Sequence, residues 1–349
     1  MAHRALTQRV SFSACVWWPR ALYDGAVATV FVTGGSGFIG QKLIRRLVDE
    51  GNVVFALARS ERSGELLAEL GAQPMPGDLS DLDSLKAAAN GAELAFHAAA
   101  HVAEWGPKWQ FEEINVRGTS HVIDACRAAG VRRLVHVSTE AVLLAGKPLV
   151  NVDESAPLRP DSKSPYCSSK AKAEQLVHDA NVDGLETVCV RPRFVWGKGD
   201  TTLLPSMVEM VKAGRFAWIG GGHHLTSTTH VDNAVEGLVL AAQRGKPGGV
   251  YFVTDGEPVE FREFVTKLLG TQGVVAPDRN VPLAPARRGA ATGEMLWRLL
   301  PLKGSPPLTR MAVWVSSLET TINISRAREE LGYRPVRTRE DGLDELISV

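Results

Sequence analysis

The chain has 349 residues, of which 44% are hydrophobic and 22% are charged. This balance is typical of a globular protein and excludes a predominantly disordered chain. The 39 Lys and Arg residues equal the 39 Asp and Glu residues, so no basic excess indicates nucleic acid or an anionic membrane as the main partner.

Cysteine spacing and hydropathy exclude several further classes of protein. The four cysteines and nine histidines show no zinc-type spacing, so we expect no metal site and ordinary thiols. No uninterrupted apolar run reaches the roughly 18 residues that indicate a membrane-spanning helix. We therefore expect a cytoplasmic protein without a transmembrane segment.

The first 26 residues differ from the rest of the chain. They contain Arg4, Arg9 and Arg20 but no acidic residue before Asp24. The sequence predicts that residues 1–26 are a disordered extension. A targeting segment and an over-long start assignment are the alternatives.

Strand-like and helix-like segments then alternate. Residues 27–33 form an apolar, β-branched run that predicts a buried strand, and a glycine-rich turn and a helical pattern follow it. Further predicted strands are 53–58, 73–76, 93–98, 133–137 and 186–191, and further predicted helices are 82–90, 115–129 and 166–180. This alternation predicts an α/β fold of the Rossmann type, with a doubly wound parallel sheet.

The pattern loosens after about residue 195, where Gly and Pro become frequent. Residues 271–310 show no clean period, which predicts irregular connections there. We predict a dinucleotide-binding domain over 27–195, to which 228–255 returns, and a smaller C-terminal substrate lobe formed by 196–227 and 256–349.

The segment Gly34-Gly35-Ser36-Gly37-Phe38-Ile39-Gly40 lies between the first predicted strand and helix. Glycine at Gly34, Gly37 and Gly40 allows a tight turn and a close approach of the backbone to a pyrophosphate. The helix that begins at Phe38 and Ile39 would offer free N–H groups and a positive dipole end to that anion. The segment therefore predicts a dinucleotide site.

The end of the second strand indicates which dinucleotide binds. An NAD site usually has an acidic residue there, which binds the ribose 2′-hydroxyl. Here Ala58 is followed by Arg59, whose guanidinium suits a 2′-phosphate. This favours NADP over NAD, although a solvated surface arginine is the alternative.

Tyr166 and Lys170 have the i, i+4 spacing that puts both side chains on one face of a helix. An ammonium near a phenol favours the phenolate, so this tyrosine could exchange a proton with a substrate oxygen. Ser138 and Thr139 follow a predicted strand at the edge where ligands bind in such sheets.

In this order and spacing, the three motifs resemble the extended short-chain dehydrogenase/reductase family. The resemblance runs from about residue 27 to the C-terminus. Within the family, segments 137–142 and 306–310 are most similar to the 3β-hydroxysteroid dehydrogenase-like branch. Matching positions along the family's cofactor groove are Asp78, Leu79, Ala98, Ala99, Asn115, Pro192 and Val195.

The resemblance implies roles for individual residues. Tyr166 would be the general acid/base, and Lys170 would bind the nicotinamide ribose and lower the pKa of Tyr166. Thr139 would align the substrate oxygen, with Ser138 as the alternative, and Asn115 would hold a relay water or the local backbone. Candidate substrate residues are Glu140, Trp105 and Arg193.

The resemblance thus implies an NAD(P)-dependent oxidoreductase that interconverts a secondary alcohol and a ketone on a fairly apolar small molecule, either steroid-like or isoprenoid-like. A homodimer follows by analogy with the family. Dehydratases of the family carry two adjacent acids after the threonine, whereas Ala141 follows Glu140 here, so water elimination is disfavoured.

Two alternatives remain open. A sugar-nucleotide epimerase or reductase would share every motif and would need basic groups in the second lobe. The cations available there are Arg193, Lys198, Arg215 and Arg310. A non-enzymatic NADP-binding regulator is the other alternative, but such relatives usually lack the Tyr/Lys pair.

Overall fold

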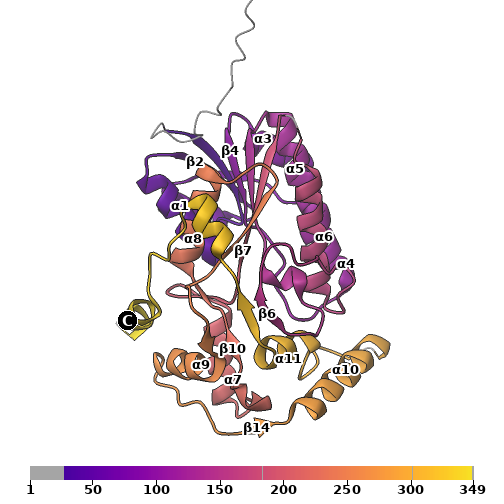
Figure 1. Cartoon of the computed structure of the whole chain (residues 1–349). Coiled ribbons are helices and arrows are strands. Elements are labelled where there is room, and N and C mark those ends of the chain that lie inside the picture. Colours follow the sequence, from indigo (N-terminus) through magenta and orange to yellow (C-terminus); the bar gives the residue numbers. More distant parts are fainter. Residues whose placement is uncertain (1–26, 183, 301, 348–349) are drawn as a thin grey trace, which may run out of the picture.

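The structure is a computed structural model, and it describes residues 27–182, 184–300 and 302–347. The predicted extension 1–26 lies outside the described residues. Figure 1 shows a large sheet flanked by helices in the upper part of the molecule and a smaller lobe of short strands and helices below it.

Seven parallel strands form the large sheet, in the order β12–β7–β5–β4–β1–β2–β3. Their bounds are β1 Thr29–Thr33, β2 Val53–Ala58, β3 Gln73–Pro76, β4 Leu94–His97, β5 Arg133–Val137, β7 Glu186–Pro192 and β12 Gly249–Val253. The strand order reverses between β1 and β4, which is where dinucleotides bind in such sheets. The predicted Rossmann-type fold is confirmed.

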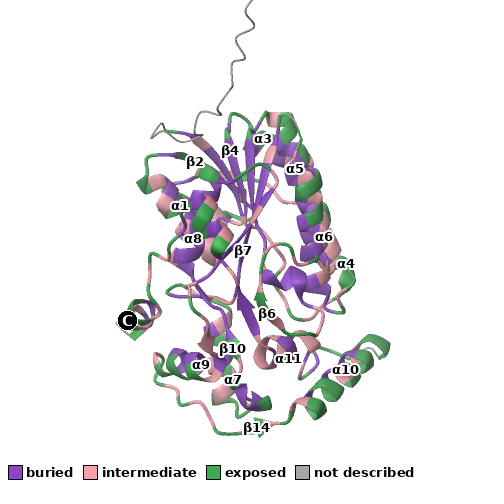
Figure 2. Ribbon diagram, in the orientation of Figure 1, coloured by how far each residue is buried: buried purple, intermediate pink, exposed green. Residues whose placement is uncertain are grey.

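Helices cover both faces of this sheet (Figure 1). They are α1 Phe38–Asp49, α2 Glu61–Glu69, α3 Leu82–Ala89, α5 Gly118–Ala129, α6 Pro165–Asp179 and α8 Val231–Arg244. Helix α1 packs on α8, whereas α5 packs between α3 and α6. Every residue of β4 and β5 is buried because helices lie on both sides, as Figure 2 shows.

The predicted helix 115–129 is interrupted in the structure. A short helix α4, Lys108–Phe111, continues into a π-helix, η1 Glu112–Arg117, and α5 begins only at Gly118. Single π-helical turns within α-helices are frequently found at functional sites. This one contains Asn115, a predicted site residue.

The lower lobe contains a four-stranded sheet in the order β13–β10–β15–β6. Its strands are β6 Leu149–Val152, β10 Leu225–Thr226, β13 Val259–Glu260 and β15 Thr320–Ile322. Two further pairs are β8 Val195–Trp196 with β11 Thr229–His230, and β9 Trp218–Ile219 with β14 Asn280–Val281. The remaining elements are η2 Glu140–Leu143, α7 Leu203–Lys212, η3 Gly220–Gly222, α9 Phe261–Gly270, α10 Leu283–Leu299, α11 Arg310–Ser317, η4 Ala327–Leu331 and α12 Arg339–Ile347.

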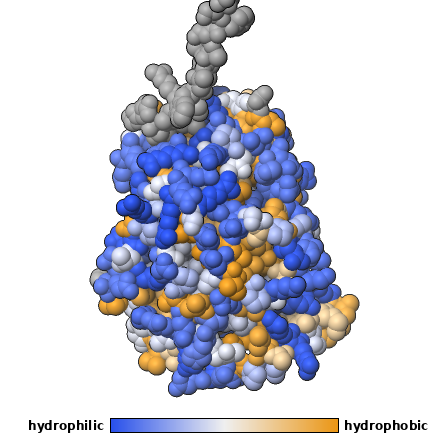
Figure 3. All heavy atoms as spheres, in the orientation of Figure 1, coloured by the Kyte–Doolittle hydropathy of each residue, from blue (hydrophilic) through white to orange (hydrophobic). Residues whose placement is uncertain are grey.

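The prediction of irregular structure over 271–310 is wrong for residues 283–299, which form α10. The helix is hard to recognise because Met295, Leu296 and Leu299 are 51%, 39% and 73% exposed, so its apolar residues do not follow one buried stripe. Figure 3 shows apolar surface at the lower right of the molecule, in the region where Figure 1 draws α10.

Candidate active site

The glycine turn brings the backbone of β1 against the backbone that follows β4. Gly34 has φ +74°, and a Cβ there would overlap the backbone of Ala98 and Ala99. A Cβ at Gly40 would overlap the carbonyl oxygen of Gly34. Gly37 is the N-cap of α1 and makes no side-chain cap, so N–H groups of the first turn remain open to an anion. These residues fit a dinucleotide pyrophosphate.

The predicted groove residues lie around this turn. Arg59 follows β2 directly and is exposed. The Asp78 carboxylate accepts hydrogen bonds from the Ser80 N–H and hydroxyl, at 2.9 and 2.7 Å, and these bonds lower its pKa. Leu79 lies against Gly118 at the start of α5.

The far side of the groove is formed by β7 and the segment after it. Pro192 is the last residue of β7, and Val195 is the first residue of β8. In the loop that follows, a Cβ at Gly199 would lie 3.8 Å from the Phe38 ring. This loop therefore approaches the N-terminus of α1.

Tyr166 and Lys170 lie in the first two turns of α6, whose N-cap Ser164 accepts a hydrogen bond from the Cys167 N–H. Both side chains are buried, with 8% and 2% of the residue exposed. The Lys170 Nζ donates to the Val137 carbonyl oxygen at 2.9 Å and lies 3.2 Å from His136 Nε2. The Lys170 ammonium thus bonds α6 directly to the end of β5.

The ionisation of Tyr166 differs from the sequence expectation. Burial raises the pKa of its phenol well above the ordinary value, and the charge of Glu140 raises it further. A hydrogen bond with Thr139 acts in the opposite direction but is smaller. Lys170, whose own pKa is lowered to about 8 by burial, directs its Nζ at Val137 and His136. The structure therefore favours the protonated phenol.

Asn115 connects three segments beside the catalytic helix. Its Oδ1 accepts from the His101 N–H at 2.6 Å, and its Nδ2 donates to the His101 carbonyl at 3.2 Å and to Ser169 Oγ at 3.0 Å. Its side chain thus holds the backbone after β4 next to α6. This is one of the two roles that the resemblance implies.

Glu140 and Arg193, two candidate substrate residues, bind each other. Arg193 Nη1 donates to Glu140 Oε1 at 2.5 Å, and their side chains are 1% and 6% exposed. The third candidate, Trp105, lies below the guanidinium of Arg298, whose Cζ is 5.4 Å from the indole ring centre. Trp105 is half-buried.

The surroundings of Tyr166 are apolar. It belongs to a cluster that joins the upper part of the molecule to α11, with Phe111, Ala141, Leu144, Cys167, Trp314 and Leu318. Trp314 also lines an open cleft between α10 and α11. The other lining residues of that cleft are Gly146, Arg287, Ala290, Arg310 and Val313.

Several buried polar residues at this site escaped prediction. His97 bonds Thr33 and Thr119, and its ring lies 5.1 Å from that of His136. Glu174 and Arg191 form a second buried ion pair. The only sequence signal for these contacts was a histidine or an arginine within an apolar strand. That signal does not identify the residue to which the side chain is hydrogen-bonded.

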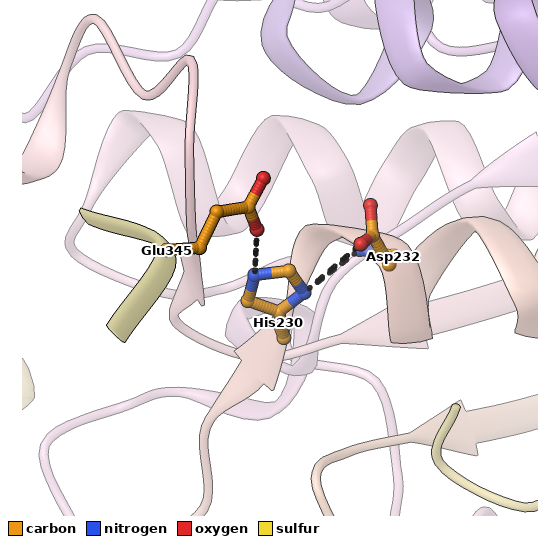
Figure 4. A group of neighbouring side chains, drawn as sticks. All are labelled: His230, Asp232 and Glu345. Atoms are coloured by element: carbon orange, nitrogen blue, oxygen red, sulfur yellow. Dashed lines mark hydrogen bonds and ion pairs between the residues drawn. The ribbon is translucent and has the colours of Figure 1, made fainter. Parts of the chain in front are cut away.

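Among the described residues, one group has the composition of a metal site: His230, Asp232 and Glu345. Figure 4 shows the imidazole between the two carboxylates, with Nδ1 3.7 Å from Asp232 Oδ2 and Nε2 3.9 Å from Glu345 Oε2. The two ring nitrogens point in different directions, and Asp232 also pairs with Lys42 and Arg337. The group therefore connects α8 to α12 rather than converging on one ion.

Comparison with known proteins agrees with this geometry. Residues 31–283 match the family model for the 3-beta hydroxysteroid dehydrogenase/isomerase family. The chain belongs to this family. It is an NAD(P)-dependent oxidoreductase of the extended short-chain dehydrogenase/reductase type, which confirms the resemblance predicted from the motifs.

Two relatives within the curated proteins are reductases. The chain is 48% identical over 316 residues to 4-hydroxy-2-methyl-3-oxo-4-farnesyl-3,4-dihydroquinoline-1-oxide ketoreductase of Stigmatella aurantiaca, covering 90% of this chain and 95% of the relative. It is 38% identical over 324 residues to 2-alkyl-3-oxoalkanoate reductase of Stenotrophomonas maltophilia, covering 91% and 98%.

A solved relative has the same fold. The dTDP-glucose 4,6-dehydratase DesIV of Streptomyces venezuelae, crystallised with NAD, matches with a TM-score of 0.72 at 25% identity, over 91% of this chain and 95% of that one. In the described part of this family member, no helix combines the length and apolarity needed to cross a bilayer.

Proposed function

We propose that this enzyme reduces a ketone to a secondary alcohol on an apolar substrate, with Tyr166 as the proton donor and NADPH as the preferred cofactor. The observation that carries the proposal is the position of the buried Tyr166, one helical turn before Lys170 on α6 and inside an apolar cluster. Two relatives bear the names of reductases whose substrates carry a farnesyl or an alkyl chain.

In this reaction, bound NADPH would supply a hydride to the carbonyl carbon. Tyr166 would donate its proton to the carbonyl oxygen as negative charge develops there. Lys170, one helical turn away, would stabilise the phenolate that remains. Gly34, Gly37 and the first turn of α1 would hold the pyrophosphate.

The preference for NADPH rests on Arg59. This side chain is exposed and directly follows β2, whose last residue is Ala58 rather than the acid that would bind a ribose 2′-hydroxyl. A guanidinium can bind a phosphate through two parallel hydrogen bonds. We therefore assign the adenosine 2′-phosphate to Arg59.

Three of the cations that could bind a sugar nucleotide are already in ion pairs, which supports an apolar substrate instead. Arg193 pairs with Glu140, Arg215 with Glu209, and Arg310 with Glu294. A carboxylate already neutralises each of these three guanidinium groups. Binding a diphosphate through any of these three arginines would require its ion pair to open.

The test follows NADPH consumption with a long-chain 2-alkyl-3-oxoalkanoate. A separate reaction with NAD follows the conversion of a UDP-sugar to its epimer by chromatography, because epimerisation returns the hydride and consumes no cofactor. Tyr166→Phe should bind NADPH normally but lose about 100- to 10,000-fold in kcat on the ketone. Tyr251→Phe, in β12, is the matched control and should retain turnover. Wild-type turnover by Tyr166→Phe, or reaction with the UDP-sugar alone, contradicts the proposal.

The same protein can be titrated with NADPH and NADH. Arg59→Ala should weaken NADPH binding by about 10-fold or more and leave NADH binding unchanged. Equal effects on the two cofactors would show that Arg59 does not bind a 2′-phosphate.

A further inference from the structure

The Lys170 ammonium faces two acceptors at the end of β5. Its Nζ donates to the Val137 carbonyl oxygen at 2.9 Å and lies 3.2 Å from His136 Nε2. Both residues with side chains at this contact are almost fully buried, with 2% of Lys170 and 1% of His136 exposed. An ammonium has three hydrogens and no lone pair. Val137 and His136 therefore take two of these hydrogens, and one is left for a ligand.

The contact with lysine fixes the tautomer of His136. Burial lowers the pKa of Lys170 to about 8, so the amine is still mostly charged at neutral pH. His136 Nε2 must then be the nitrogen with the lone pair, and the ring hydrogen lies on Nδ1. That Nδ1 is buried and has no hydrogen-bond partner in the described part of the chain. The contact with Lys170 thus leaves one buried ring donor without an acceptor.

Packing alone does not explain a histidine at position 136. A buried polar group without a partner destabilises a protein, and such a group in a natural structure requires a specific explanation. Leu134, two residues earlier on the same face of β5, is fully buried and has no polar side-chain atom. An apolar side chain could fill position 136 in the same way. The bond to Lys170 is the contact that only the imidazole provides.

The neighbouring His97 is the opposite tautomer and is bonded elsewhere. Thr119 Oγ1 donates its one hydrogen to the Asn115 carbonyl at 2.6 Å, so it accepts from His97 Nε2 at 2.9 Å. His97 Nδ1 then accepts from the Thr33 hydroxyl at 2.7 Å. Since Nδ1 of His136 has no partner among the described residues, no hydrogen bond joins the two rings. The pair is therefore not a proton relay, and His136 acts on the lysine alone.

Two acceptors orient an ammonium better than one. A lysine has a flexible stem and three donors that rotate about the end of it. One hydrogen bond leaves Nζ free to rotate about that bond, whereas two define the direction of the third hydrogen. Without His136, the Val137 carbonyl would remain as the single acceptor of Nζ among the described residues.

We propose that His136 is a positioning residue, whose Nε2 lone pair holds the Lys170 ammonium at the end of β5 and leaves its third N–H available on the face of α6 that carries Tyr166. The proposal rests on the proposed function, in which Lys170 stabilises the phenolate that Tyr166 becomes. His136 acts through Lys170 and requires no contact with the substrate or the cofactor.

The tautomer of His136 is the direct test, because it requires neither cofactor nor turnover. NMR of the protein with isotope-labelled histidine should place the ring hydrogen of His136 on Nδ1 and that of His97 on Nε2. Lys170→Met removes the donor and should move the Nε2 signal of His136, but not the signals of the exposed His178. A hydrogen on His136 Nε2 overturns the proposal, because that nitrogen could not then accept from the lysine.

Two substitutions separate the hydrogen bond from packing. His136→Leu removes the acceptor, so kcat for ketone reduction should fall about 10-fold or more, as expected for the loss of one hydrogen bond to a charged group. KM should change less than about twofold, because His136 does not touch the substrate. In His136→Gln, the side-chain carbonyl reaches the region of Nε2, and this acceptor should restore most of the lost kcat.

Cys189→Ala is the matched control. Cys189 is buried and lies beside His136 in the neighbouring strand β7, so the substitution changes packing in the same row of the sheet. It should keep kcat within about twofold of the wild type. If His136→Leu does not fold, His136→Asn replaces it, because its carbonyl reaches the region of Nδ1 instead of Nε2. Equal values of kcat in the Gln variant and the variant without an acceptor at Nε2 also overturn the proposal.

The two proposals fail in different ways. If Tyr166→Phe retains turnover, the proposed function is wrong and the positioning role fails with it. If Tyr166→Phe abolishes turnover but His136→Leu keeps the kcat of the wild type, only the positioning role is wrong.

Discussion

Two buried imidazoles, His97 and His136, lie next to each other beside Lys170. The two ring nitrogens of His97 bond Thr33 Oγ1 at 2.7 Å and Thr119 Oγ1 at 2.9 Å. Burial, and then the nearby Lys170 ammonium, lower the pKa of His97 to about 3. His136 is shifted downward for the same two reasons. These rings therefore remain neutral in the folded protein, and an acceptor nitrogen of His136 faces Lys170.

The neutral His97 makes stability depend on pH. Its pKa is about 3 in the folded protein, against an ordinary value of 6.5 for a solvated imidazole, so the unfolded chain binds more protons between these values. The free energy of unfolding should therefore fall as the pH drops from about 6.5 towards 3, and His97 should contribute about 1.4 kcal/mol per pH unit.

Denaturant unfolding at about pH 7.5 and about pH 5.5 measures this dependence. Between these two pH values, the free energy of unfolding should change less in His97→Asn than in the wild type, whatever the absolute stability of the variant. His178→Asn is the control because that side chain is exposed. An unchanged difference in His97→Asn would falsify the assignment.

Among the elements, α1 depends most on a single turn. Gly34 adopts a positive φ, and Gly40, in the first turn of α1, packs against the Gly34 carbonyl. The turn accommodates no side chain at either position. The same contact that packs helix against strand also brings the N-terminus of α1 into the groove, so packing and cofactor binding depend on the same atoms.

Gly40→Ala should therefore reduce both stability and cofactor binding. The added methyl group would overlap backbone atoms that cannot move without displacing β1, which should cost about 1–3 kcal/mol. NADPH binding should weaken at least about 10-fold, because about 1.4 kcal/mol of lost interaction corresponds to that factor.

Gly289→Ala in α10 is the matched control, because no atom lies within 4 Å of a Cβ there. It should raise stability by up to about 1 kcal/mol through helix propensity. Chemical unfolding and NADPH titration of both variants test the comparison. A stable Gly40→Ala protein with normal NADPH affinity would contradict the role of this turn.

At the scale of the whole molecule, the chain passes repeatedly between its two parts. Strand β6, which precedes the catalytic helix, pairs with β15 near the C-terminus. After β15 the chain returns to α8. Asn233 of α8 donates to the Asp255 carboxylate and to the Arg337 carbonyl, and it accepts from the N–H groups of Val336 and Arg337. The buried side-chain amide of Asn233 thus connects α8 to Asp255 and to the segment 336–337.

Asn233→Ala should destabilise the protein by about 3 kcal/mol, because the buried Asn233 amide makes four hydrogen bonds, two of them from the backbone N–H groups of 336–337. Limited proteolysis should also cut the C-terminal segment faster. Asn323→Ala, which loses one exposed hydrogen bond, should cost only about 0.5 kcal/mol. Equal stability losses in the two variants would show that Asn233 does not hold this segment.

Local patterns were sufficient for much of the fold and for the centre of the candidate site. The strands β1, β2 and β5, the glycine turn and the helix with Tyr166 and Lys170 follow from short-range periodicity and turn chemistry. Helix α10 was missed because its apolar residues are largely exposed, and periodicity identifies a helix only through the stripe that it buries.

The sequence by itself determined the fold class, the cofactor turn and the Tyr166/Lys170 pair, because each depends on residues close together in the chain. Only the tertiary structure decided that Glu140 pairs with Arg193, 53 residues away, and that burial raises the pKa of the Tyr166 phenol. Such partners are set by strand order and by the packing of the two lobes. The charge that a buried group carries then depends on these partners and on the water that folding removes.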